Sequence, residues 1–191
     1  MDNGFVVRVV ERPLEKVEPE LYQHLAALRA AAPESARFLA QRLFSDSMVQ
    51  GVGNKLAWED FLSRPKKGVH VLIDGNDFGS INKRWGQSVG DEAIKAMGGA
   101  LSRASRASKG KLFRVGGDEF RAHFDTPEQA YTFARNARTE LEALPPIQGE
   151  HFHSVSMGLG PSPEHAEQAL IHAKSAKARA CYLPGQAQTH A

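Results

Sequence analysis

The sequence predicts an α+β fold in which helices cover one face of a mainly antiparallel sheet. Apolar runs of strand length occur at 69–73, 112–115, 119–124 and 151–159, and turn residues border them. The stretches between them carry apolar residues at helical spacing. The resulting order is strand, helix, hairpin, helix, strand, helix, and such segregated elements favour an α+β architecture.

Residues 1–45 predict a short strand followed by two helices. Phe5–Val10 is apolar and β-branched, and Pro13 stops it. From Pro19, leucines recur on one helical face, and Pro33 suits the first position of a second helix. The apolar side of that helix is expected to consist of Phe38, Leu39 and Leu43. These helices are expected to cap the following domain, with a dimerisation arm as the alternative.

The next segment predicts a capped helix and a buried strand. Asn54 is a candidate N-cap for a helix that ends near Pro65 and supplies core contacts from Leu56, Trp58, Phe61 and Leu62. Val69–Ile73 is apolar on both faces except at His70, as in a buried central strand. His70 is expected to be packed or edge-exposed rather than a metal ligand.

Two acidic segments follow strand ends. Asp74-Gly75-Asn76-Asp77 comes directly after 69–73, while Gly116-Gly117 predicts a type I′ turn, with φ > 0 at both glycines, that presents Asp118 and Glu119. Carboxylates from two strand ends favour a Mg²⁺ site for nucleotidyl transfer, in which substrate phosphates supply further ligands. The alternative is a solvated acidic tip. A calcium-binding EF-hand is excluded, because Phe78 and Trp85 occupy positions that require oxygen ligands.

The remaining helices are predicted from apolar residues at helical spacing and from N-cap residues. A helix with Ala93, Ile94, Met97 and Leu101 on one side should end in the polar stretch 102–110. Thr126-Pro127-Glu128 begins a second helix, and Ser162-Pro163-Glu164 begins a third that carries Lys174. His151 and His153 on the strand 151–159 are expected to be exposed, and 182–191 to be a frayed tail.

Composition restricts the class of protein. The 191 residues carry a net charge of +2, which implies neither a nucleic-acid surface nor an acidic tail. A single cysteine, Cys181, excludes a disulfide framework. No apolar run reaches the ~18 residues of a membrane span, and no secretory signal is visible. A soluble cytoplasmic protein is expected, with no nucleic-acid or membrane partner.

Four motifs carry a resemblance. Arg114-Val115-Gly116-Gly117-Asp118-Glu119-Phe120 resembles the defining motif of the GGDEF family, the diguanylate cyclases. Leu72–Asn82, with Gly86 and Gly90-Asp91, resembles the family's D-x-D-x-F-K-x-I-N-D stretch and its continuation. Ser154–Gly158 resembles the S-x-G strand, and Ala169–Lys174 the A-L-Y-x-A-K helix. Four motifs in the family's order are far more specific than one pentapeptide.

The resemblance implies a ferredoxin-like palm formed by residues 46–183, with 184–191 as a tail. It implies condensation of two GTP molecules to cyclic di-GMP, with Mg²⁺ or Mn²⁺ as cofactor. Because each site holds one GTP, it also implies that two copies meet as an antiparallel catalytic homodimer.

The resemblance also assigns site residues. Asp74, the Gly75 carbonyl and Asp118 would hold metal, and Glu119 would complete the metal shell or help deprotonate the attacking hydroxyl. Asn82 and Asp91 match the residues that recognise guanine, and Lys174 would bind the triphosphate. The remaining substrate-binding positions are Gly116, Gly117 and Phe78.

The chain departs from the family pattern at several positions. The phosphate-contacting lysine is replaced by Gly79, the second acid of D-x-D by Asn76, and the arginine after the last helix by Ala178. No R-x-x-D precedes the hairpin, so no feedback site of that type is expected. In the loop before the first capped helix, alignment puts Ser47, not Asp46, at the family's aspartate position. Two alternatives therefore stay open: a related palm-domain cyclase that makes another cyclic nucleotide, and a weakly active domain that binds GTP or a partner as a switch.

Overall fold

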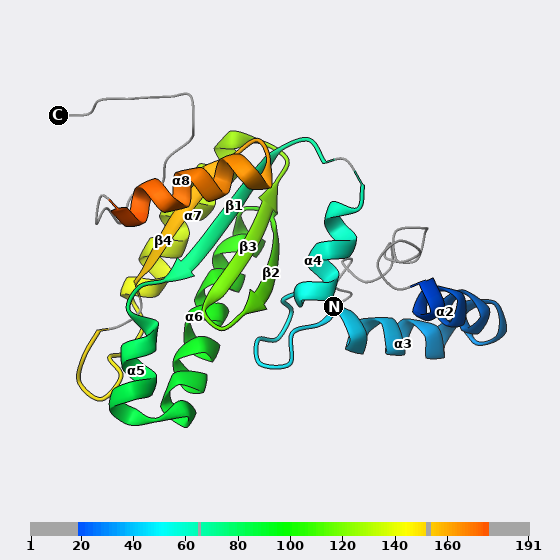
Figure 1. The fold of residues 1–191 in the computed structure, drawn as a ribbon, viewed down its shortest axis with the longest axis horizontal. Coiled ribbons are helices and arrows are strands. Elements are labelled where there is room, and N and C mark those ends of the chain that lie inside the picture. The colour runs from blue at the N-terminus through cyan, green and yellow to red at the C-terminus, as the bar shows by residue number, and fades with distance from the viewer. Residues whose placement is uncertain (1–18, 65, 152–153, 176–191) are drawn as a thin grey trace.

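A four-stranded antiparallel sheet in the order β2-β3-β1-β4 lies at the centre of the structure (Figure 1). The structure is a computed structural model that describes residues 19–64, 66–151 and 154–175. The strands are β1 (Val69–Gly75), β2 (Lys111–Gly116), β3 (Glu119–Phe124) and β4 (Val155–Gly160). All three pairings are antiparallel, which confirms the predicted sheet.

Helices cover both faces of this sheet, so the prediction of helices on one face is wrong. α6 (Gln87–Ala107) and α7 (Pro127–Glu142) cover one face, and Val71 and Ile73 of β1 are fully buried in the main core on that side. α8 (Pro163–Ser175) lies on the other face, where it packs on Leu72. The central strand β1 carries apolar residues on both faces, so both faces have to be covered by helices.

Glycines allow α8 to lie directly on β4. A Cβ added at Gly158 would clash with the backbone of Ala166 and Leu170. A Cβ added at Gly160 would lie 2.6 Å from the Cβ of His165. The two glycines therefore set how closely this helix approaches the strand.

The predicted N-terminal helices are α2 (Pro19–Ala31) and α3 (Pro33–Phe44). The expected apolar side of α3 is wrong at Phe38 and Leu39, which are 60% and 42% exposed, whereas Leu43 packs against the core as predicted. Its buried residues are instead Ala36, Ala40 and Phe44. They share one side of the helix at four-residue spacing, and the two alanines allow close packing there. The predicted strand 5–10 and the tail 182–191 lie outside the described residues.

α4 (Lys55–Leu62) is capped as predicted. Asn54 Oδ1 accepts a hydrogen bond from Ala57 N at 3.0 Å. Trp58 and Phe61 are buried against Phe113 of β2, and Phe44 of α3 belongs to the same cluster. α4 thus joins the N-terminal helices to the sheet.

The remaining helices lie close to their predicted bounds. α5 (Phe78–Trp85) follows β1 after a short loop, and α6 ends at Ala107, within the polar stretch 102–110 as predicted, with Ser102 and Ser105 buried. α7 begins with a capping box in which Thr126 Oγ1 accepts a hydrogen bond from Gln129 N. β4 begins later than predicted, at residue 155; His151 is exposed, and His153 is outside the described residues. No described helix is long and apolar enough to cross a membrane.

Candidate active site

The turn between β2 and β3 consists of Gly117 and Asp118. Gly116 is still part of β2 and pairs with Glu119, after an irregularity in register beyond Arg114. The predicted type I′ turn centred on both glycines is therefore wrong by one residue, and only Gly117 has positive φ, at 45°. Glycine at the first central position is the requirement of type II′ turns. As a result, Asp118 lies in the turn while Glu119 is the first residue of β3.

Arg114 of β2 holds this turn in place through a hydrogen bond and an ion pair. Arg114 Nε donates a hydrogen bond to Gly117 O at 2.8 Å, and its Nη1 lies 3.2 Å from Asp46 Oδ2. Asp46 Oδ1 accepts from the backbone N–H groups of Met48 and Val49. The ion-paired side chains are only 12% and 7% exposed. Asp46, rather than the aligned Ser47, is thus the aspartate that joins this loop to the hairpin.

The acidic residues of the two segments meet at one end of the sheet. Asp74 of β1 is the register partner of Glu119. Asp118 lies against Gly75: its Oδ2 is 2.7 Å from where a Cβ on Gly75 would be. Only glycine permits this approach, which brings the Asp118 carboxylate to the backbone of the β1 end. The structure therefore brings together Asp74, Gly75, Asp118 and Glu119.

The electrostatics of these acids suit a bound cation. Burial raises the pKa of Asp118, and the charges of Asp74 and Glu119 raise it further against a backbone hydrogen bond and Lys174. In the described residues no three acidic, histidine or cysteine side chains form a complete metal-binding group. An incomplete oxygen set fits Mg²⁺, which commonly takes one or two carboxylates and completes its shell with water and substrate phosphates.

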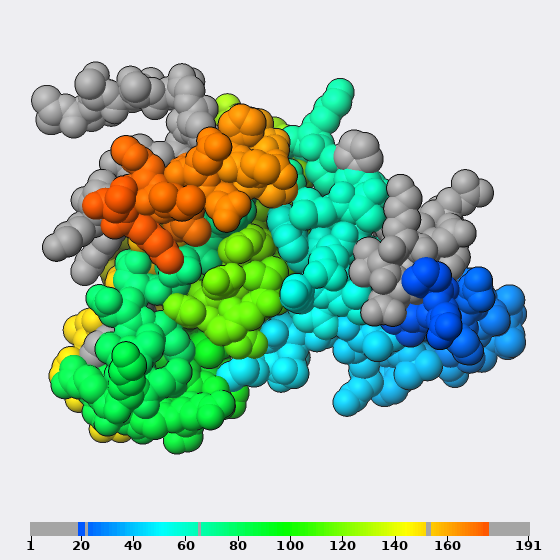
Figure 2. Space-filling view, in the orientation of Figure 1, coloured from blue at the N-terminus to red at the C-terminus, as the bar shows by residue number. Residues whose placement is uncertain are grey.

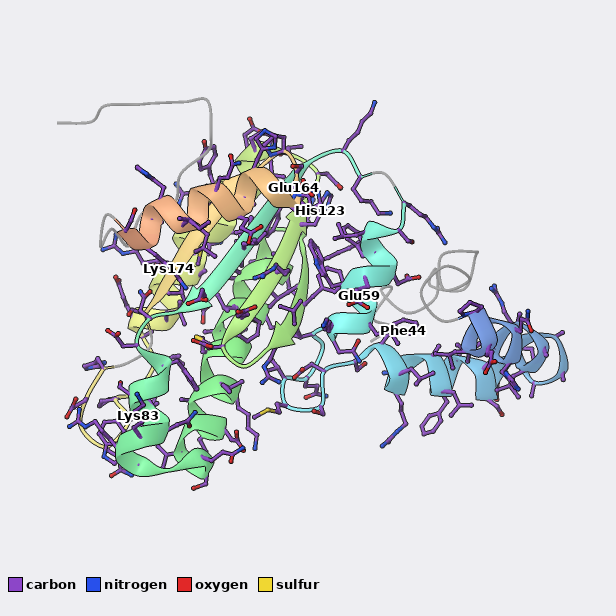
Figure 3. The ribbon with its side chains drawn as sticks, in the orientation of Figure 1. Phe44, Glu59, Lys83, His123, Glu164 and Lys174 are labelled. Carbon is purple, nitrogen blue, oxygen red and sulfur yellow. The ribbon has the colours of Figure 1, made fainter. Side chains whose placement is uncertain are left out.

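Lys174 reaches the same acids from α8. Its Nζ lies 2.7 Å from Asp74 Oδ1, and the lysine side chain is 45% exposed. Figure 3 shows Lys174 near the C-terminal end of α8. The predicted phosphate-binding lysine is thus paired with a predicted metal ligand.

Arg121 is a second basic residue at the site, and the sequence reasoning missed it. Its Nη2 lies 3.5 Å from Glu119 Oε2, and its Nη1 donates to Phe120 O at 3.1 Å. Burial lowers its pKa, while the negative charges of Glu119, Glu167 and Asp74 oppose that effect. The signal was the strand alternation, which puts residues 119 and 121 on one face of β3.

The first predicted guanine-binding residue, Asn82, lies against the residue that precedes the second, Asp91. Asn82 is exposed on α5, and its Oδ1 lies so close to Gly90 of α6 that a Cβ there would clash. Asp91 is the next residue and is half-buried. Phe78, in contrast, is packed in the main core, so only its backbone is available to a substrate. Gly116 and Gly117 have no atom near their Cβ positions and leave the hairpin tip open.

Two of the positions that depart from the family pattern, Asn76 and Gly79, have different surroundings. The Asn76 side chain is occupied: its Nδ2 donates to Ser154 Oγ at 3.3 Å, and its Oδ1 accepts from Ser156 Oγ at 2.8 Å. Gly79 lies on α5 with open space around its Cβ position. Asn76 therefore ties the acidic loop to β4, whereas nothing steric requires glycine at position 79.

Sequence comparison connects these features to known proteins. Residues 53–182 match the model of the family described as "Diguanylate cyclase, GGDEF domain". The probable diguanylate cyclase DgcI of Escherichia coli K12 is 29% identical over 123 residues, which are 60% of this chain and 28% of that protein. The probable diguanylate cyclase DgcC of the same strain is 38% identical over 78 residues, or 37% of this chain and 21% of that one. The matches thus span less than a third of each relative.

Solved structures share the fold. The coiled coil and GGDEF domain of DgcB from Caulobacter crescentus, solved in complex with c-di-GMP, has a TM-score of 0.67 at 20% identity. That similarity covers 87% of this chain and 98% of the DgcB chain. The GGDEF domain of TpbB (YfiN) from Pseudomonas aeruginosa has a TM-score of 0.55 at 25% identity, over 72% of this chain and 92% of that chain. The described fold is therefore the GGDEF palm.

Proposed function

The chain belongs to the GGDEF diguanylate cyclase family, and on that premise we propose that it condenses two GTP molecules into cyclic di-GMP, releasing two pyrophosphates. The observation that carries the proposal is the convergence of acids at one sheet end. Asp118 lies on Gly75, next to Asp74. A carboxylate pair beside a backbone carbonyl is the oxygen environment that a phosphate-bound divalent cation requires.

Asp74, the Gly75 carbonyl and Asp118 would hold Mg²⁺ or Mn²⁺. When bound, the cation polarises the α-phosphate and neutralises charge on the leaving pyrophosphate. Glu119 faces the same space from β3 and would bind the cation or accept the proton of the 3′-hydroxyl. The raised pKa of Asp118 is consistent with a carboxylate that is stabilised once positive charge is present.

The chain's own residues would bind and orient the nucleotide. Lys174 supplies a positive charge for the triphosphate. Asp91 would accept hydrogen bonds from guanine N1–H and the 2-amino group, and the Asn82 amide would pair with the rest of the base edge. Adenine lacks both of those donors and would leave Asp91 unpaired, which costs binding free energy.

The reaction requires two copies of the chain. Cyclic di-GMP contains two nucleotides, and one acid cluster with one pair of base-reading residues accommodates one of them. Two copies would therefore place their hairpins face to face, with each 3′-hydroxyl directed at the other nucleotide's α-phosphate.

The decisive experiment incubates the purified chain with Mg²⁺ and each of the four nucleoside triphosphates, and identifies the products by mass. Cyclic di-GMP from GTP alone supports the proposal. A different cyclic nucleotide would point to a related palm-domain cyclase instead. Asp118→Asn serves as the matched inactive control, because the change removes a charge and keeps the side-chain size.

A GTP-binding switch with little turnover is a second candidate, and two observations favour it. Position 76 carries a neutral amide committed to Ser154 and Ser156, and position 79 lacks a side chain. Both reduce the charged groups available at the site. Tight GTP binding without any product in the same assay would favour this function over the cyclase.

A further inference from the structure

Each of two basic side chains is paired with a different acid of the site. Lys174 comes from α8 and contacts Asp74 at 2.7 Å, whereas Arg121 comes from β3 and lies 3.5 Å from Glu119. Both acids belong to the group that would hold the divalent cation. Without a metal ion, the clustered carboxylates repel one another, and the two cations offset that repulsion.

We propose that Lys174 and Arg121 are counter-ions of Asp74 and Glu119 that exchange with a divalent cation, and that Arg121 is a second phosphate-binding cation. This inference rests on the proposed function and extends it to a residue outside the family motifs. When a divalent cation binds the acids, it replaces the positive charges that pair with Asp74 and Glu119. The two released side chains then bind the phosphates that arrive with the cation.

The position of Arg121 is compatible with this exchange. Glu119 and Arg121 share one face of β3, so both side chains lie on the side of the sheet that α8 covers only in part. In Figure 2 the surface of the β2–β3 hairpin is visible between α8 and α4. The Arg121 side chain is 19% exposed, so its guanidinium is not sealed in the core. Arginine also matches phosphate geometry through paired N–H donors.

The charge of the site gives a reason for such a cation. The family's phosphate-contacting lysine is replaced by Gly79, so that position supplies no positive charge. Lys174 alone would face a substrate with about four negative charges. An arginine between Glu119 and the helix α8 restores a second positive charge from a different element.

Exchange and simple positioning predict opposite changes in metal affinity. If Arg121 only holds Glu119 in place, then Arg121→Ala weakens binding of both the bare cation and the metal–nucleotide complex. If Arg121 competes with the cation, then Arg121→Ala strengthens binding of the bare cation and weakens binding of the metal–nucleotide complex. The pair of measurements therefore separates the two roles without any turnover.

The experiment measures two affinities in wild type, Arg121→Ala, Lys174→Ala and the control Arg138→Ala. Arg138 lies on α7 and pairs with Glu142 on the surface, so the control removes an ion-paired arginine elsewhere. The first affinity is for Mn²⁺ alone, followed by electron paramagnetic resonance. The second is for a GTP analogue with a methylene bridge between the α- and β-phosphates, measured by calorimetry in excess Mg²⁺.

For Arg121→Ala and Lys174→Ala, we expect Mn²⁺ to bind about two- to fivefold more tightly, as for the loss of a half-exposed ion pair. We expect the analogue to bind about tenfold more weakly, as for a lost charge-assisted hydrogen bond. GMP, which has no β- or γ-phosphate, should bind all four proteins equally. Weaker Mn²⁺ binding or unchanged analogue binding in Arg121→Ala would overturn the proposal. Both affinities are readable even if no cyclic di-GMP is formed, so this failure is distinct from failure of the proposed function.

Discussion

The strands β1 and β3 carry two pairs of titratable side chains on the same face, and the two pairs have opposite surroundings. Asp74 pairs in register with Glu119 at one end, and His70 pairs with His123 four residues away on each strand. The acids lie at the open hairpin end, with Glu119 exposed. The histidines are 3% and 5% exposed, next to Trp58 and Phe61 of α4.

The comparison shows that a covering helix determines whether a pair of titratable side chains is buried or stays accessible to other ions. Over the histidines, α4 excludes water, and burial together with the neighbouring His123 lowers the pKa of His70 to about 4, against an opposing effect of Glu164. Over the acids α8 covers the face only in part and contributes Lys174, so basic residues and, as proposed, a metal ion with its substrate provide compensation. One pair is therefore packed as neutral rings, while the other lies at the open hairpin end beside basic side chains.

The strongest test of the open end removes its carboxylates. Asp118→Asn and Asp74→Asn should each lower turnover by about a thousandfold or more, because metal-bound charge stabilisation contributes several kcal/mol. Their melting temperatures should stay close to that of the wild type, since both residues lie at segment ends. Initial rates of cyclic di-GMP formation and thermal melts provide the measurements. Asp125→Asn, at the other end of β3, is the control, and loss of activity in that variant as well would contradict a local role.

The closed end is tested by the dependence of stability on pH. His70 has its pKa lowered from 6.5 to about 4 in the folded state, so the unfolded chain binds a proton first as the pH falls. Stability should therefore be constant above pH 6.5 and decline below it, by about 1.4 kcal/mol per pH unit for a fully buried histidine, until pH 4. Urea unfolding at several pH values gives the slope. His70→Leu should reduce the slope to the contribution of His123, whose pKa burial also lowers, while the exposed His151→Gln should leave it unchanged. Equal slopes in all three proteins would refute the buried-base account.

A third test concerns the selection of the base, which is assigned to Asn82 and Asp91. The wild type should prefer GTP over ATP by well over tenfold in kcat/KM, because only guanine offers two donors to Asp91. Asp91→Ala should erode that preference and leave metal dependence unchanged, since the cation is held elsewhere. A large preference that persists in Asp91→Ala would mean that other residues read the base.

The smallest expected effect comes from restoring a side chain. Gly79→Lys should lower KM for GTP by a few-fold, because it adds a positive charge where the Cβ position is open. It should also stabilise α5 by about 1 kcal/mol, as a glycine is replaced inside a helix. Gly99→Lys on α6 makes the same replacement away from the site and isolates the helix effect. Identical KM changes in both variants would show that the added charge does not reach the phosphates.

Local pattern predicted the elements that depend on local chemistry. The strand 69–73, the Asn54 cap and the Thr126 cap were all predicted, because an apolar run and N-cap preference are properties of neighbouring residues. The capping box that Thr126 forms with Gln129 is a finding of the structure. The family motifs also led to Asp74, Asp118, Asn82 and Asp91, and the structure brings these residues together in two pairs. The roles assigned to them stay predictions.

Features that depend on long-range packing were not predicted. The hairpin turn moved by one residue because a register irregularity after Arg114 keeps Gly116 in the strand. Phe38 and Leu39 were predicted to form an apolar stripe, yet α3 buries Ala36, Ala40 and Phe44, and Ala40 and Phe44 share a core cluster with α2 and α4. The approach of Arg121 to Glu119 depends on side-chain direction in a folded strand, which composition does not reveal.

The glycines under α8 have a consequence for the distant acid cluster. A methyl group at Gly158 or Gly160 would meet the backbone or a Cβ atom of α8, so these two glycines fix the distance between the helix and β4. Lys174 is four residues beyond Leu170, or about 6 Å along the axis of α8. Gly158→Ala would raise the helix at Ala166 and Leu170, and a rigid helix would carry that tilt to Lys174 and open its contact with Asp74. The geometry of the acid cluster is thus set partly by the absence of a Cβ at two positions of the edge strand β4.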